Sequence, residues 1–90
     1  MFKPLGNRCI VKINKRYLVD EKNKPVLDEF GNQHFEQEQE CTVIESNIEG
    51  LKKGAVVIPI IRGGVPILKE ETKKYAVYII DFEDIYGIKK

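Results

Sequence analysis

The sequence predicts a small all-β protein, and three observations carry this prediction. Short runs rich in Val, Ile and Tyr recur along the chain, a composition that favours strands. Glycine and proline turns separate these runs. No stretch keeps the apolar spacing of three and four residues that marks a helix. Helix should therefore be scarce, and the strands should close into a small β-barrel.

Each expected strand is bounded by turn residues. The first covers Arg8 to Ile13 and follows turn residues at Pro4 to Asn7. The later strands are expected at 41–45, 55–61, 65–68, 75–80 and 85–88. Pro59 lacks a backbone donor, so the strand at 55–61 should end, bulge or lie at a sheet edge there. The acidic segment 81–84 should form a corner before the last strand.

One long stretch does not fit the strand pattern. From Asn14 to Glu40 the chain is polar and shows no clear helical or strand period, and it exceeds the ordinary length of a connection in a compact domain. We therefore interpret residues 14–40 as a functional loop. Its middle carries a short apolar island, Pro25, Val26 and Leu27, in surroundings too polar to form a core. Such an island indicates a tether point or a binding site. We detect no internal repeat in the sequence.

Length and charge limit the possible functions. Ninety residues make one domain, 1–90, and such a short chain buries only a little over about 60% of its unfolded surface, so association with further copies would help its stability. Fifteen basic and 14 acidic residues nearly cancel, which argues against nucleic acid as a partner. The longest apolar run is far shorter than the roughly 20 residues of a membrane span, and the N-terminus lacks the apolar core of a signal peptide. We expect a cytoplasmic protein with no membrane partner.

The residues offer little chemistry. Cys9 and Cys41 lie in apolar runs, as expected of small buried hydrophobes in a reducing compartment, and whether the two thiols approach each other stays open. The single histidine, His34, fits no zinc spacing with them. No nucleophile lies beside a plausible base, and the carboxylates fall in turns. We expect no enzyme, no catalytic residue, no metal and no cofactor.

Four segments, taken in their order and spacing, resemble the GroES-type co-chaperonins, the ten-kilodalton chaperonin family. The run Lys3-Pro4-Leu5-Gly6-Asn7-Arg8 resembles the family's opening into its first barrel strand. Residues 41–44 are similar to the strand that follows the family's mobile loop, and 51–58 to a turn and strand of the barrel. Residues 77–88 resemble its closing strand, acidic corner and last strand. The resemblance covers most of the chain.

The resemblance implies a fold, a function and partners. The fold would be a GroES-like β-barrel with a long mobile loop after strand one, at about 14–40. The protein would cap a GroEL-type chaperonin ring through these loops and close the folding chamber in a nucleotide-dependent cycle that assists protein folding. Its partners would be the chaperonin and further copies of itself in a homo-oligomeric ring, the family's heptamer.

The resemblance also implies two sets of site residues. The tripeptide that docks on the chaperonin corresponds to Pro25, Val26 and Leu27. The first and last strands join neighbouring subunits in the family, which gives a subunit interface of Arg8, Cys9, Ile10, Val11, Ile85, Tyr86 and Ile88. The apolar residues among them could equally be core, and in so small a chain we expect them to serve both roles.

The chain departs from the family pattern in two places. Only Glu45 to Gly50 stands where members carry a hairpin that roofs the dome, so the dome should be open, as in co-chaperonins of bacteriophages. Pro25 occupies the first tripeptide position, where the family usually has an aliphatic residue. The rival tripeptide, Tyr17-Leu18-Val19, lies close behind the first strand and is expected to pack against the barrel.

Two other classes of function remain open at the level of sequence. A small barrel could bind single-stranded nucleic acid with Tyr75, Tyr78 and Phe82 as stacking residues. The chain could also be a structural adaptor barrel whose long loop is a linker. Protection of the loop from protease by an added chaperonin would distinguish the adaptor from the co-chaperonin.

Overall fold

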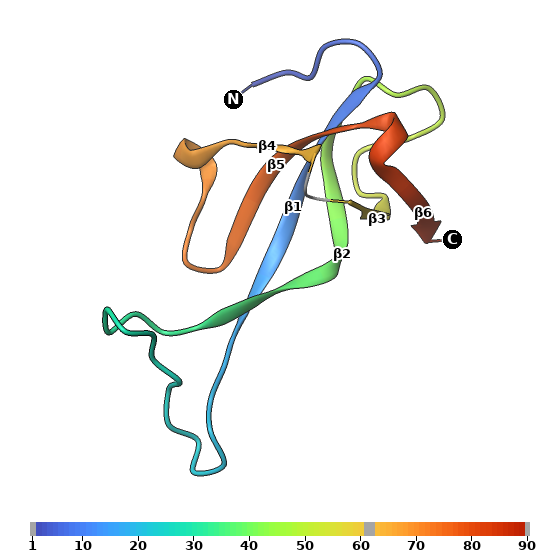
Figure 1. Cartoon of the computed structure of the whole chain (residues 1–90). Helices are drawn as coiled ribbons and strands as arrows, with labels where there is room; N and C mark the ends of the chain where they lie inside the picture. Colours follow the sequence, from blue (N-terminus) through green and yellow to red (C-terminus); the bar gives the residue numbers. More distant parts are fainter. Residues whose placement is uncertain (1, 61–62, 90) are drawn as a thin grey trace.

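The computed structural model describes residues 2–60 and 63–89, and it shows a curled antiparallel sheet from which a long arm projects (Figure 1). The strands are β1 (Arg8–Tyr17), β2 (Phe35–Ser46), β3 (Val56–Pro59), β4 (Val65–Pro66), β5 (Tyr75–Asp81) and β6 (Ile85–Lys89). Two short 3-10 turns are η2 (Leu68–Glu70) and η3 (Phe82–Asp84), and no α-helix occurs in these ranges. The all-β prediction is confirmed.

All six strands belong to one sheet with the order β4-β5-β1-β2-β3-β6. Every pair in it is antiparallel. β4 and β6 stand at the two ends of this order and are not hydrogen-bonded to each other. The described residues therefore form an open ladder, whereas the sequence predicted a closed barrel.

The core lies on both faces of the central strand β1, because its side chains alternate across the sheet. Cys9, Val11 and Ile13 point to one face and join the larger cluster, together with residues of β2, β3 and β5 and the buried Ile48 and Leu51. Ile10 points to the other face and packs with Ile67 and Val77. A strand with partners on both edges and apolar contacts on both faces is the anchor of such a small sheet.

β1 and β2 run much further than the sequence predicted. Their ladder continues beyond Ile13↔Cys41 through Lys15↔Gln37 to Tyr17↔Phe35. Residues 14–17 and 35–40, assigned above to the long loop, are therefore strand residues, and Lys15 to Tyr17 pair with Phe35 to Gln37 as a two-stranded stem. The acidic-glutamine segment Glu38 to Glu40 faces Asn14 alone, so it forms a bulge, and bulges bend and twist a strand. β2 bends sharply where the arm leaves the body (Figure 1).

The remaining elements follow the sequence with small shifts. The ladder between β3 and β6 changes register between Ile58 and Pro59, which confirms the irregularity expected at Pro59. β3 is shorter than the run predicted at 55–61, whose last residue lies outside the described ranges. At the predicted acidic corner, Asp81 caps η3 by accepting a hydrogen bond from the Glu83 N–H at 3.1 Å. Only Val65–Pro66 of the run at 65–68 is strand, and η2 begins at Leu68.

The connection from β2 to β3, residues 47–55, is a short loop that contains no further hairpin. Ser46 accepts a hydrogen bond from the Ile48 N–H at 3.0 Å, and Ile48 and Leu51 are buried beneath the turn. Gly54, with φ +93°, completes it in the left-handed region that glycine adopts without strain. Residues 47–55 therefore contribute no paired strands above the sheet.

Candidate functional site: the projecting arm

The base of the arm is fixed to the body by Lys15. Its side chain is only 8% exposed, and its Nζ lies 2.8 Å from a Glu71 carboxylate oxygen. The same Nζ donates a hydrogen bond to the Thr72 carbonyl at 2.9 Å and lies 4.8 Å from the centre of the Phe35 ring. Lys15 thus joins the stem to the loop before β5 through contacts of three kinds.

The outer end of the stem is closed by an aromatic pair. Tyr17 and Phe35 lie opposite each other in the ladder, with ring centroids 5.5 Å apart and planes tilted by 57°. Aromatic cross-strand pairs of this kind stabilise exposed ribbons. Beside them, Arg16 forms an ion pair with Glu36 on the partner strand. The stem is therefore held by backbone pairing and side-chain pairs, without a core of its own.

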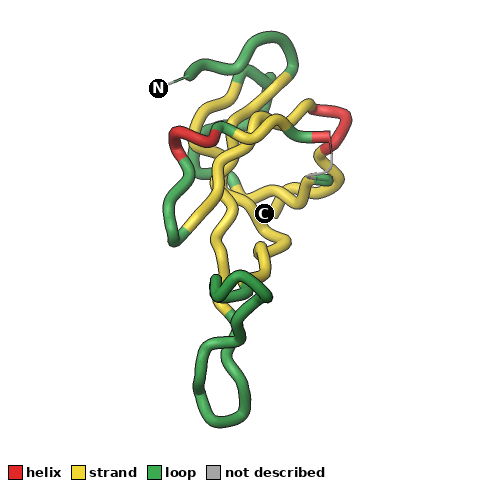
Figure 2. Tube along the Cα trace, turned by 60° about the vertical axis from the view of Figure 1, so that its left-hand side comes forward, coloured by secondary structure: helices red, strands yellow, loops and turns green. Residues whose placement is uncertain are grey.

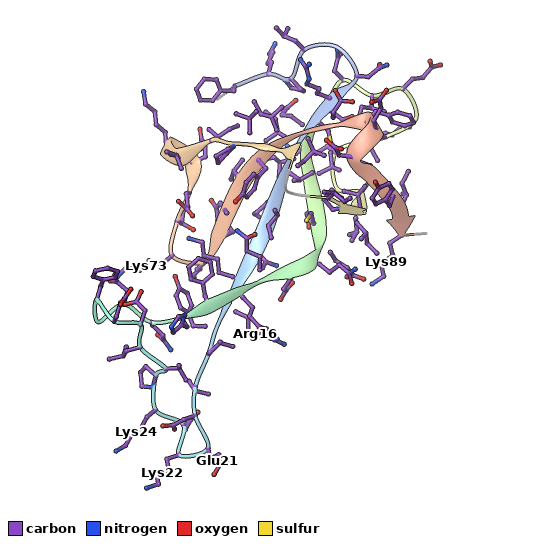
Figure 3. The ribbon with its side chains drawn as sticks, viewed as in Figure 1. Arg16, Glu21, Lys22, Lys24, Lys73 and Lys89 are labelled. Atoms are coloured by element: carbon purple, nitrogen blue, oxygen red, sulfur yellow. The ribbon has the colours of Figure 1, made fainter. Side chains whose placement is uncertain are left out.

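Beyond the stem the chain makes a first turn from Val19 to Pro25, which form a β-bridge. The carboxylate of Asp20 accepts hydrogen bonds from the N–H groups of Lys22 and Lys24, both at 2.9 Å. Asn23 has φ +63°, and its N–H donates to the Asp20 carbonyl at 2.9 Å. This turn forms the far end of the arm, where Figure 3 shows Glu21, Lys22 and Lys24.

A second turn from Leu27 to Gln33 repeats this geometry eight residues later. The carboxylate of Asp28 accepts from the N–H groups of Phe30 and Asn32, at 2.8 and 2.9 Å. Gly31 has φ +81° and donates to the Asp28 carbonyl at 3.1 Å, as Asn23 does to Asp20 in the first turn. The arm beyond the stem therefore consists of two tandem turns with the same backbone plan.

Each turn is closed at its base by a backbone hydrogen bond between residues eight positions apart. The Val26 N–H donates to the Leu18 carbonyl at 3.1 Å, and the His34 N–H donates to the Val26 carbonyl at 2.8 Å. Residues 18–25 and 26–33 are thus structural copies, although no repeat was detected in the sequence. The signal that could have revealed them is the recurrence of Asp-Glu at 20–21 and 28–29, each followed by Asn or Gly where φ is positive.

The predicted chaperonin-binding tripeptide lies where one turn passes into the next. Pro25 is exposed and Leu27 is 56% exposed. Val26 is only half-buried, but both of its backbone groups are used inside the arm. The tripeptide is therefore on the arm and away from the body, with Leu27 as its most accessible large apolar side chain.

The rival tripeptide does not pack against the body as expected. Tyr17 pairs with Phe35 at the stem end, and the Leu18 N–H donates to the His34 carbonyl at 2.9 Å. Val19 is 51% exposed in the first turn. Neither core cluster contains any of these residues. Figure 2 shows from a second side how far the arm extends beyond the sheet. All of 17–19 therefore belongs to the arm.

The predicted subunit-interface residues fall into two groups. Cys9, Ile10 and Val11 are fully buried within the single chain, and the backbone of β1 pairs with β2 on one side and β5 on the other. These three residues therefore belong to the core of one chain, and their role at a subunit interface stays a prediction. Arg8 is exposed and forms a 3.5 Å ion pair with Asp81.

The residues of the last strand are accessible. β6 pairs only with β3, so its other edge has no strand partner in the described residues. Ile85 is half-buried against the larger core cluster, whereas Tyr86 and Ile88 are 71% and 53% exposed. Of the predicted interface, Tyr86, Ile88 and the free edge of β6 are available to a second copy.

The two cysteines are buried free thiols. Burial raises the pKa of Cys9 from 9.0 to about 11. Burial also raises the pKa of Cys41 to about 11, with smaller contributions from the charges of Cys9 and Glu38. A thiol that keeps its proton is a poor nucleophile and a poor metal ligand. Within residues 2–60 and 63–89, His, Cys, Asp and Glu form no group of three that could hold a metal ion.

The aromatic residues of the nucleic-acid alternative do not share a surface. Tyr78 packs against the larger core cluster and Tyr75 against the smaller one, on opposite faces of the sheet. The Lys12 ammonium lies 5.2 Å from the centre of the Tyr75 ring, and Phe82 is exposed in η3. These three rings cannot stack successive bases of one strand.

No helix in the described ranges is both long and apolar enough to cross a membrane. Comparisons with protein-family models, with curated proteins and with solved structures find no match to this chain.

Proposed function

We propose that this chain is a co-chaperonin of the GroES type, which caps a GroEL-type chaperonin ring and closes its folding chamber in a nucleotide-dependent cycle. The observation that carries the proposal is the arm: residues 18–34 project beyond the sheet with no core of their own and expose apolar side chains (Figure 3). The order and spacing of the co-chaperonin-like segments along the chain support it further. The GroES-like barrel, the open dome of the bacteriophage type and the cytoplasmic location belong to the same proposal.

One arm alone binds weakly. Burying Val26 and Leu27 contributes roughly 1.5 to 3 kcal/mol each, whereas fixing each backbone residue that was free costs about 1 to 2 kcal/mol. A small net gain per arm becomes useful when several arms on one assembly bind together, because each bound arm raises the effective concentration of the next. Release then needs only a modest change at each site of the partner ring.

We assign the contact between copies of the chain to β6. An edge strand with free backbone groups readily pairs with another chain, and Tyr86 and Ile88 add exposed apolar surface beside it. A homo-oligomeric ring built through this edge, with the family's seven subunits, would present the arms on one side.

The test replaces Val26 and Leu27 together with Asp and mixes the protein with a GroEL-type chaperonin and nucleotide. We expect the sheet to fold and the capped complex to be lost, because charged side chains cannot enter an apolar groove. Val19→Asp is the matched control, since Val19 is the counterpart of Leu27 in the first turn. Unchanged co-elution of the double variant with the ring would reject the site.

A further inference from the structure

The two turns of the arm share a backbone but differ in the side chains at their tips. Lys22 stands in the first turn where Phe30 stands in the second, since each provides the first N–H bound by the capping aspartate. The first tip is charged, with Glu21, Lys22 and Lys24 at the far end of the arm (Figure 3). The second tip carries an aromatic ring. The backbone plan alone therefore cannot explain why one of the two tips is apolar.

Phe30 is exposed far more than its size would lead one to expect. It is 81% exposed, the highest value among the large hydrophobic residues of the described chain. Aromatic side chains dominate the binding energy of protein interfaces when they fill a pocket on the partner. A Phe that a hydrogen-bonded turn exposes to water is therefore suited to fill a pocket on a partner.

The apolar tripeptide is less accessible than Phe30. Val26 is half-buried, and its N–H and C=O are both bonded within the arm, to Leu18 and His34. To bind as an extended segment, the tripeptide would have to break these bonds. The second turn, by contrast, presents Leu27 and Phe30 with its hydrogen bonds intact.

We propose that the arm docks with both turns formed and that Phe30, together with Leu27, is its apolar anchor. This inference rests on the proposed function, because it names the binding residues of the arm for an apolar groove on the chaperonin ring. A preformed turn loses less conformational entropy on binding than a free loop does. The capping carboxylates of Asp20 and Asp28 would then serve affinity as well as local structure.

The test compares Phe30→Ser with Lys22→Ser, the same change at the equivalent position of the other turn. GroEL-type chaperonin rings are immobilised on a surface, and the binding of each variant to them is measured in the presence of nucleotide. We expect Phe30→Ser to weaken binding at least tenfold, Lys22→Ser to change it less than about threefold, and Phe30→Leu to restore most of it.

A second variant tests the preformed turn. Asp28→Ala keeps Phe30 but removes the cap, so we expect faster hydrogen exchange at the Phe30 and Asn32 amides and weaker binding in the same assay. Thiols of Cys9 and Cys41 that stay inaccessible to a thiol reagent show that the body of each variant is folded.

The outcomes separate the inference from the function. Wild-type binding that Phe30→Ser leaves unchanged, while the Val26 and Leu27 double variant abolishes it, overturns the inference and leaves the function standing. Failure of the wild-type protein to bind any ring overturns both.

Discussion

At the scale of single residues, Lys15 makes three kinds of contact that hold the arm to the body. It is nearly buried, pairs with Glu71, donates to the Thr72 carbonyl and covers the Phe35 ring. These contacts tie the stem of the arm to the body, so this side chain helps to hold the arm in its direction.

We predict that Lys15→Met lowers the free energy of unfolding by about 1 to 3 kcal/mol, because hydrogen bonds to charged groups contribute that much and the Glu71 carboxylate loses its partner. Lys22→Met, at the exposed far end of the arm, should change it by less than about 0.5 kcal/mol. Urea unfolding measures both. Equal effects of the two substitutions would show that Lys15 does not fasten the arm.

The buried thiols predict a loss of stability at high pH. Both keep their protons in the folded chain up to about pH 11, whereas unfolded thiols ionise from about 9.0. The unfolded state therefore binds fewer protons in this window, and the free energy of unfolding should fall there by about 1.4 kcal/mol per pH unit for each thiol. Below pH 9 this contribution is fully retained.

Urea unfolding between pH 8 and 11 checks the effect. The double variant Cys9→Ala and Cys41→Ala is the control, and its stability should decline less steeply with pH. Parallel curves for the two proteins would count against burial as the cause.

At the scale of elements, the strands of the body could be predicted and the stem of the arm could not. The body strands bury apolar side chains, so runs such as Tyr75 to Ile80 show the expected composition. Lys15 to Tyr17 and Phe35 to Gln37 pair as a ribbon outside the core clusters, where no apolar alternation is required. Their pairing depends on backbone bonds and on the Tyr17–Phe35 contact, which no periodicity in the sequence reports.

The sequence pointed to some of the exposed apolar residues of the arm and not to others. The apolar island marked residues 25–27 correctly as lying on the arm. Phe30 was missed because a single aromatic residue in a polar stretch carries no pattern, and its exposure follows from the turn that Asp28 holds. The sequence left open whether Cys9, Ile10 and Val11 are core or interface, since a sequence does not show which strand has two partners in the sheet.

The free edge of β6 predicts the behaviour of the chain in solution. Tyr86→Lys should leave the fold intact and lower self-association, because it adds charge to an exposed edge and removes apolar surface. Leu68→Lys is the matched control: Leu68 is 72% exposed but follows β4, at the opposite end of the strand order. Sedimentation velocity at micromolar concentration distinguishes them. Self-association that Leu68→Lys reduces and Tyr86→Lys does not would place the interface at β4.

At the scale of the whole molecule, a small sheet supports an arm that is long for its body. The chain measures 46 × 28 × 19 Å along its principal axes, and the arm accounts for the elongation seen in Figures 1 and 2. Such a shape suits a protein that contacts its partner at a distance from its own core. In the proposed co-chaperonin, weak contacts at each arm would require an assembly of several copies.

Mixed assemblies test this dependence on the number of arms. We predict that blending wild-type chains with the Val26 and Leu27 double variant lowers ring binding more steeply than in proportion to the wild-type fraction, because the arms act together. Binding to the immobilised ring across the blend gives the curve. A linear decline would mean that each arm binds independently.

The most direct measurement is electron microscopy of this protein mixed with a GroEL-type chaperonin, with and without nucleotide. We expect density for a cap at the end of the ring only when nucleotide is present, with connections from the cap to the ring where the arms dock. Rings without a cap in every nucleotide state, with this protein in large excess, would contradict the proposed function.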